Sequence, residues 1–256
     1  MDDTCEELAL KASPADQQLL LQVQQIDTGL DQLDYQQRTL PEHEKLVALD
    51  ARLATLRDDA IRVQTEVGDL KRDVTKAELE VEQVRKRMAR DQELLESGSI
   101  TVSKQLEELQ HEVSTLARRQ TELEDAELEV LEVLEQTEKR FNEISAQTEA
   151  ANTDHEATTA ARDSAIAEIA RKRSEANAER ELIVKGLPAD VVSLYDKLRA
   201  DNGGVGAAEL KGARCEGCRM QIPATELTRI ADADADEVVR CEECRRILVR
   251  PAGHMT

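Results

Sequence analysis

The sequence predicts a mainly α-helical protein, a long antiparallel coiled-coil hairpin that carries a small C-terminal four-cysteine ribbon of short β-strands. Two long stretches with apolar residues at helical spacing predict the hairpin, and two Cys-x-x-Cys pairs near the C-terminus predict the ribbon. Only three of the 256 residues are aromatic, although 40% are hydrophobic and the formal net charge is -20. Aliphatic side chains without aromatics suit a thin seam between helices better than a thick globular core.

The first arm has the most regular apolar pattern. Its apolar residues advance by three or four positions in strict alternation over six heptads, from Leu46 to Met88. This seven-residue repeat indicates a coiled coil and argues against disorder, the other explanation for so acidic a chain. A shorter stretch precedes it, with Ser13 as the expected N-cap and Pro14 at the first helical position. Pro41 separates the two stretches and should end or kink the helix there.

The second arm begins after a Gly/Ser turn near residues 97–100. Its apolar track runs from Leu106 to Ile144, weakens over residues 148–159, and ends before Gly186. Because the arms before and after the turn have similar lengths, the simplest arrangement is a hairpin formed within one chain, and hence a monomer. A parallel dimer is the alternative, but it would leave the matched lengths unexplained. Pairing around the turn sets Pro41 opposite the weak stretch, so we expect both arms to be irregular, and the hairpin to bend, at that level.

These patterns divide the chain into three parts. The hairpin takes residues 1–185, a short linking helix takes 186–202, and the ribbon takes 203–256. In the linking helix, one face carries four apolar residues that can dock the ribbon onto the base of the hairpin: Val191, Leu194, Tyr195 and Leu198.

Four of the five cysteines have the spacing of a metal site. Cys215 and Cys218 form one Cys-x-x-Cys pair, and Cys241 and Cys244 form another after 22 intervening residues. Four thiolates suit one tetrahedral zinc ion and leave no open position for water, so we expect a structural Zn²⁺. A redox pair or an iron–sulfur cluster is less consistent with the flanking sequence and the spacing. Cys5 lies far from the pairs in sequence and is expected to be a free thiol.

Membrane proteins, secreted proteins and enzymes are not expected, because the chain lacks their sequence features. No apolar run approaches the roughly 20 residues needed to span a membrane. The N-terminus is acidic, where a signal peptide would be basic and then apolar. We therefore expect a cytoplasmic protein with no membrane association. The sequence also contains no phosphate-binding glycine loop, nucleophile elbow or HExxH motif, so we expect no enzymatic activity.

The knuckles, together with the segment after the turn, resemble those of the bacterial C4-type zinc-ribbon coiled-coil proteins. The resemblance rests on GARCEGCRMQIP (residues 212–223), VRCEECRRILV (239–249) and VSKQLEELQHEV (102–113). It implies a helical hairpin with a zinc ribbon, no enzymatic activity and an adaptor-like role. Members are described as nucleic-acid-binding, and some serve flagellar or secretion systems by binding partner proteins. The family usually has Gly where this chain has Arg245, and often has Asn and Arg where it has Lys104 and Gln105.

Two functions remain open from the sequence. The first is a non-enzymatic adaptor, scaffold or chaperone-like protein that binds unidentified partner proteins through the coiled coil. The second is nucleic-acid binding, to RNA or DNA or in association with transcription, by an arginine-rich face of the ribbon, because guanidinium groups match phosphate geometry. The chain's net charge opposes non-specific nucleic-acid binding, and the ribbon itself has 8 Lys/Arg against 9 Asp/Glu. The candidate contact residues are Arg214, Arg219, Arg240, Arg245, Arg246 and Arg250.

Overall fold

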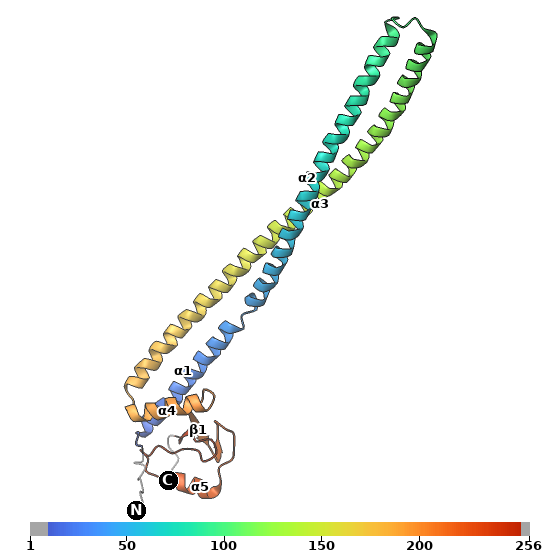
Figure 1. Ribbon diagram of the computed structural model, residues 1–256. Helices are drawn as coiled ribbons and strands as arrows, with labels where there is room; N and C mark the ends of the chain where they lie inside the picture. Colours follow the sequence, from blue (N-terminus) through green and yellow to red (C-terminus); the bar gives the residue numbers. More distant parts are fainter. Residues whose placement is uncertain (1–9, 252–256) are drawn as a thin grey trace, which may run out of the picture. The chain divides into compact units, whose positions relative to one another are not determined.

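The computed structural model describes residues 10–251 (Figure 1). No helix in this part of the chain is both long enough and apolar enough to cross a bilayer. The elements, in chain order, are α1 (Pro14–Arg38), α2 (Pro41–Glu96), α3 (Ser103–Lys185), α4 (Ala189–Asp201), β1 (Ala207–Lys211), β2 (Arg214–Cys215), α5 (Ala224–Asp232) and β3 (Ile247–Val249). The chain divides into two compact units, Met1–His43 with Ala161–Thr256, and Glu44–Ala160.

The unit formed by residues 44–160 is the coiled-coil hairpin. Its seam buries Leu53, Leu56 and Val63 of α2 against Ile144 and Ala151 of α3. Two ion pairs also join the helices: Lys71 Nζ lies 2.8 Å from a Glu138 oxygen, and Arg85 lies 2.6 Å from Glu124. Because the residue numbers rise along α2 as they fall along α3, the helices are antiparallel. The predicted hairpin within one chain is confirmed.

The weak stretch of the second arm is not a break in the helix. α3 is continuous from Ser103 to Lys185, whereas the first arm is interrupted at Thr39 and Leu40, just before Pro41. The expected irregularity of the second arm is therefore wrong. Ala151, inside the weak stretch, is fully buried in the seam with Leu53 and Ile144. A small side chain therefore packs in the seam at this level. A search for large apolar residues in the sequence overlooks such a position.

The other unit joins α1, the end of α3, α4 and the ribbon. The expected cap of α1 is present, because the Ser13 hydroxyl accepts a hydrogen bond from the Asp16 N–H and the Asp16 carboxylate accepts one from the Ser13 N–H. Leu20 and Val23 of α1 are completely buried, in one core with α4 and the sheet. The predicted docking face of α4 packs into this core. Val191, Tyr195 and Leu198 are buried there, and Leu194 is partly buried.

The ribbon is built on a three-stranded sheet in the order β2-β1-β3. β1 pairs antiparallel with β2, Leu210 opposite Cys215, and parallel with β3, Ala208 opposite Leu248. The side chains of β3 are buried: Ile247 and Val249 in the core shared with α1 and α4, and Leu248 in a second core with two of the cysteines. The same short strand therefore supports both the core with α1 and α4 and the cysteine cluster.

Candidate metal centre

The four cysteines of the two pairs converge from two loops with the same backbone geometry. In the first loop the Arg219 N–H donates to the Cys215 carbonyl at 2.7 Å, and in the second the Arg245 N–H donates to the Cys241 carbonyl at 2.8 Å. Return bonds close each loop, from the Cys215 N–H to the Met220 carbonyl at 3.1 Å and from the Cys241 N–H to the Arg246 carbonyl at 2.9 Å. Each Cys-x-x-Cys pair therefore forms a tight turn that directs both of its sulfurs to one side.

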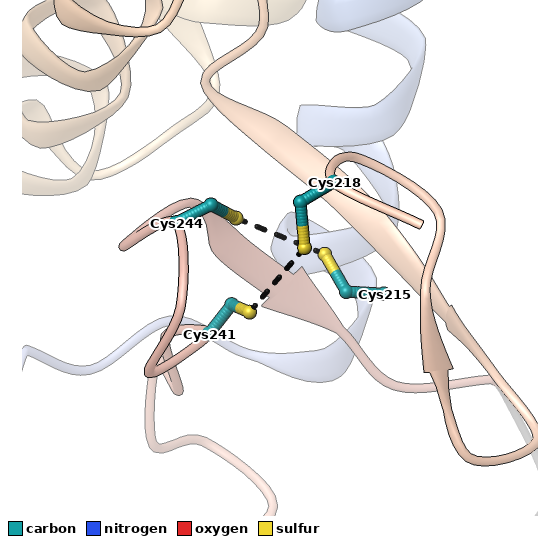
Figure 2. A group of neighbouring side chains, drawn as sticks. All are labelled: Cys215, Cys218, Cys241 and Cys244. Carbon is teal, nitrogen blue, oxygen red and sulfur yellow. Dashed lines mark hydrogen bonds between the residues drawn. The ribbon is translucent and has the colours of Figure 1, made fainter. Parts of the chain in front are cut away.

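The sulfur atoms point toward one another (Figure 2), and all four lie within 4.8 Å of each other. The Sγ atoms of Cys215 and Cys244 are 3.9 Å apart, as are those of Cys218 and Cys241. A tetrahedral zinc ion with Zn–S bonds of about 2.3 Å requires its sulfurs to lie about 3.8 Å apart. The donor set and its spacing therefore fit one such ion. Cys5 lies outside the described residues.

The environment of the sulfurs favours a bound cation. Burial raises the pKa of Cys215 to about 12 and also raises the pKa of Cys241. For Cys244 burial acts in the same direction, but hydrogen bonds from Arg246, together with those from Cys241 and Cys218, outweigh it and lower the pKa. A metal ion supplies the positive charge that buried thiolates need, because coordination deprotonates a thiol.

Two of the six candidate contact arginines bind inside the ribbon. Arg246 donates from Nε to the Val205 carbonyl at 3.0 Å and from Nη2 to the Asn202 carbonyl at 2.9 Å. Arg250 donates to five backbone carbonyls between Ile230 and Glu237, the shortest at 2.8 Å to Asp234. These guanidinium groups hold the linker after α4 and the loop after α5, a role that their sequence positions did not indicate.

The other four arginines are placed differently. Arg214 forms an exposed ion pair with Glu216 at 2.6 Å, and Arg240 is half-buried. Arg219 and Arg245 are exposed, and neither side chain has a hydrogen-bond or ion-pair partner among the described residues. Both have left-handed backbones, with φ of 63° and 64°, at the same position of their loops. Arg240 also has an interaction of its own, so only Arg219 and Arg245 of the six lack a hydrogen-bond or ion-pair partner among the described residues. The contact role of all six stays a prediction.

A helical hairpin that bears a four-cysteine ribbon is the class of protein that this fold and this site define. Residues 23–203 match the model of the CT398-like coiled coil hairpin domain, and residues 214–248 match the C4-type zinc ribbon domain. The first match covers most of the chain, so the protein belongs to the CT398-like coiled-coil hairpin family. The resemblance read from the knuckles and the segment after the turn is confirmed.

Similar proteins support this placement. An uncharacterized protein of Mycobacterium tuberculosis, Rv2229c, is 38% identical over 244 residues, which cover 95% of this chain and 99% of the relative. A solved structure from Mycobacterium smegmatis is 34% identical, with a TM-score of 0.78, and covers 94% of this chain and 100% of that one. The structure of CT398 from Chlamydia trachomatis has a TM-score of 0.62 at 15% identity, covering 93% and 98% of the two chains, a likeness of fold alone.

Proposed function

We propose that the protein is a non-enzymatic adaptor that binds partner proteins through the outer surface of its coiled coil and carries a zinc-stabilised ribbon as an end module. One observation carries this proposal. Large aliphatic side chains stand exposed on α2 away from the seam: Val47 is 69% exposed, Ile61 65% and Leu79 57%. They share one side of the helix, since 14 and 18 residues at about 100° each bring them back to within about 40°.

This outer row differs from the seam in what it can do. Seam residues of the same helix, such as Leu53 and Val63, are buried against α3, so they hold the hairpin together. The outer row has no such role in the fold. Covering its aliphatic side chains with a partner is favourable, because it removes apolar surface from water. A partner helix laid along α2 would meet anchors about 21 Å and 27 Å apart.

The zinc ribbon completes this proposal. The fit of the four sulfurs to a tetrahedral ion supports a structural zinc, which would fix the two knuckles and, through β3, the core beneath them. The ribbon would then present a rigid surface beside α1 and α4. The metal would have no catalytic part, because four protein ligands fill its coordination sphere.

Site-specific photocrosslinking in cells tests the adaptor function. A photoreactive amino acid at Ile61 or Leu79 should give one or a few defined protein adducts. Replacing the other of these two residues by a charged residue should reduce the yield of those adducts. The matched control is Glu66, which is also exposed but lies about 140° around the helix from Ile61. Equal adducts from Glu66, or none from Ile61 and Leu79, would count against partner binding by this row.

Nucleic-acid binding by the ribbon is the second candidate, and the two unpartnered arginines favour it. Arg219 and Arg245 are exposed and have no hydrogen-bond or ion-pair partner within residues 10–251, so phosphate contacts would not break internal bonds. Binding of a single-stranded RNA should then fall steeply with salt and weaken further when both arginines are replaced by glycine. The same RNA affinity in the double variant would exclude these contacts.

A further inference from the structure

We infer that a groove beside the second knuckle binds an extended, acidic segment of a partner protein, with an aliphatic side chain next to its acidic one. The groove has a volume of about 350 Å³ and lies within the unit that contains the ribbon. Its walls come from four separate segments: the residues before α1, α4, α5 and the second knuckle. The site is distinct from the outer row on α2, so it goes beyond the function proposed above.

The floor of the groove supplies apolar contact. Leu10, Leu194 and Val238 line it, and each is only half-buried although it packs against the core formed by α1, α4 and the sheet. Their remaining surface faces a concave space, where a single aliphatic side chain can be enclosed on several sides. Such enclosure makes a pocket more favourable for an apolar side chain than a flat surface is.

The rim of the groove offers a cation. Arg229, Arg240 and Arg245 line it together with Glu237, Glu242 and Cys241, and because Glu226 neutralises Arg229, the cation open to a ligand is Arg245. Arg229 is already engaged by the buried Glu226 at 2.8 Å, which fixes its guanidinium in place. Arg245 has no partner among the described residues, so its guanidinium can bind a carboxylate without losing an internal bond.

The backbone of Arg245 makes glycine the substitution that tests this contact. Its φ of 64° lies in the left-handed region, where glycine costs least and a long side chain costs more. Glycine would therefore suit the turn better, and the guanidinium is the group that the substitution would lose. A phosphate strand is the less suitable occupant, because an aliphatic floor without aromatic rings offers bases nothing on which to stack.

The chain contains its own matched control. Arg219 has the equivalent position in the first knuckle, with a φ of 63°, an exposed side chain and no hydrogen-bond or ion-pair partner in the described part of the chain. It does not line the groove. Arg245→Gly and Arg219→Gly therefore make the same chemical change at the same backbone conformation, and they differ in whether the groove loses its cation. Leu194→Ser and Leu182→Ser form a second pair, because Leu182 is 73% exposed outside the groove.

The test selects random 12-residue peptides displayed on phage against the full-length chain purified with zinc. The selected peptides should carry Asp or Glu next to Leu, Ile or Val. A fluorescent copy of the most enriched peptide should bind about tenfold more weakly to Arg245→Gly and to Leu194→Ser, as expected for the loss of one charge-assisted contact or one enclosed side chain. The Arg219→Gly and Leu182→Ser variants should bind it as the unaltered chain does.

Three results would overturn the inference. One is a selection that enriches no peptide above a surface without protein. Another is equal weakening by Arg219→Gly and Arg245→Gly, which would indicate diffuse attraction to the ribbon rather than a groove. The last is displacement of the peptide from the unaltered chain by an equal concentration of a uridine 12-mer, together with loss of 12-mer binding in Arg245→Gly. That result would assign the site to nucleic acid.

Discussion

Tyr195 of α4 donates its hydroxyl hydrogen bond to Asp27 of α1, with 2.7 Å between the two oxygens, and both side chains are buried. The same carboxylate accepts from Arg180 Nε at 2.7 Å and lies 3.4 Å from Arg199 Nε. Asp27 thus connects α1 with the end of α3 and with the helix that precedes the ribbon. A buried charge with three partners is a point where one substitution can release α4 from the hairpin base.

Asp27→Asn should destabilise this unit by about 3 kcal/mol, because it leaves two guanidinium groups without their shared anion in a buried site. The loss should be visible as roughly 100-fold faster hydrogen exchange of α4 amides. Asp196→Asn is the matched control, since Asp196 also pairs with Arg180, at 2.8 Å, but its side chain is 50% exposed. The control should cost less than about 1 kcal/mol. If the two changes destabilised the unit equally, Asp27 would not be the carboxylate that holds α4 to α1 and α3.

The Tyr195 hydroxyl should make this unit sensitive to alkali. Burial, and secondly the hydrogen bond to Asp27, raise the pKa of Tyr195 above its ordinary value of 10.0. A raised pKa in the folded state stabilises the fold fully below the unfolded pKa, and the contribution is lost as pH rises above it. Above about pH 10, the free energy of unfolding should therefore fall by at most about 1.4 kcal/mol per pH unit more than in Tyr195→Phe.

The seam of the hairpin could be predicted from sequence because its residues obey one local rule. Leu53, Leu56 and Val63 repeat at coiled-coil spacing, and all three are buried. The rule failed for α1, where Leu19 and Leu33 of the apolar stretch are only half-buried while Gln17, Gln24 and Asp27 are buried. The Gln24 side chain accepts from the Gly206 N–H at 2.7 Å and donates to the Gly204 carbonyl at 2.8 Å. Partners about 180 residues away leave no trace in local periodicity.

The cysteines and the arginines differ in the same way. Four cysteines could be assigned from spacing, because two residues between ligands directly set the geometry of a knuckle. The arginines could not be sorted, because a guanidinium near a knuckle can face solvent or reach backbone carbonyls, and only the path of distant loops decides which. Arg250, for example, binds carbonyls 13 to 20 positions earlier in the chain.

Arg250→Ala should destabilise the ribbon by about 2 kcal/mol, since several backbone carbonyls after α5 lose their donor together. Arg250→Lys should recover less than half of this, because an ammonium cannot reproduce the planar fork. The measurement is the thermal midpoint of the ribbon, followed through the methyl resonances of Leu248. Arg214→Ala, which removes an exposed ion pair, should change the midpoint little. A midpoint for Arg250→Ala equal to that of Arg214→Ala would contradict the assigned role.

Glycine in place of Arg219 or Arg245 should stabilise the ribbon rather than weaken it. Each arginine has a left-handed backbone, which costs about 1 kcal/mol for a residue with a side chain and little for glycine. The unfolded chain gains freedom with glycine, so the net gain should be about 0.5 kcal/mol. Thermal unfolding of the two variants should give midpoints at or above that of the unaltered chain. A clear drop in either would mean that the guanidinium contributes to the fold.

Removal of the metal should unfold the ribbon and spare the hairpin seam. Its small sheet carries two cores that meet at β3, and one of them includes the buried Cys215 and Cys241. Without the ion, the four metal–sulfur bonds are lost. Cys215 and Cys241, whose pKa values are raised by burial, are then left as buried thiols. Elemental analysis should give about one zinc per chain, lost in the Cys215→Ser/Cys241→Ser double variant and kept in Cys5→Ser. Chelation should collapse the dispersed methyl resonances of Leu248 while those of Val63, in the hairpin seam, stay in place. Retention of the Leu248 resonances in metal-free protein would show that the strands fold without the ion.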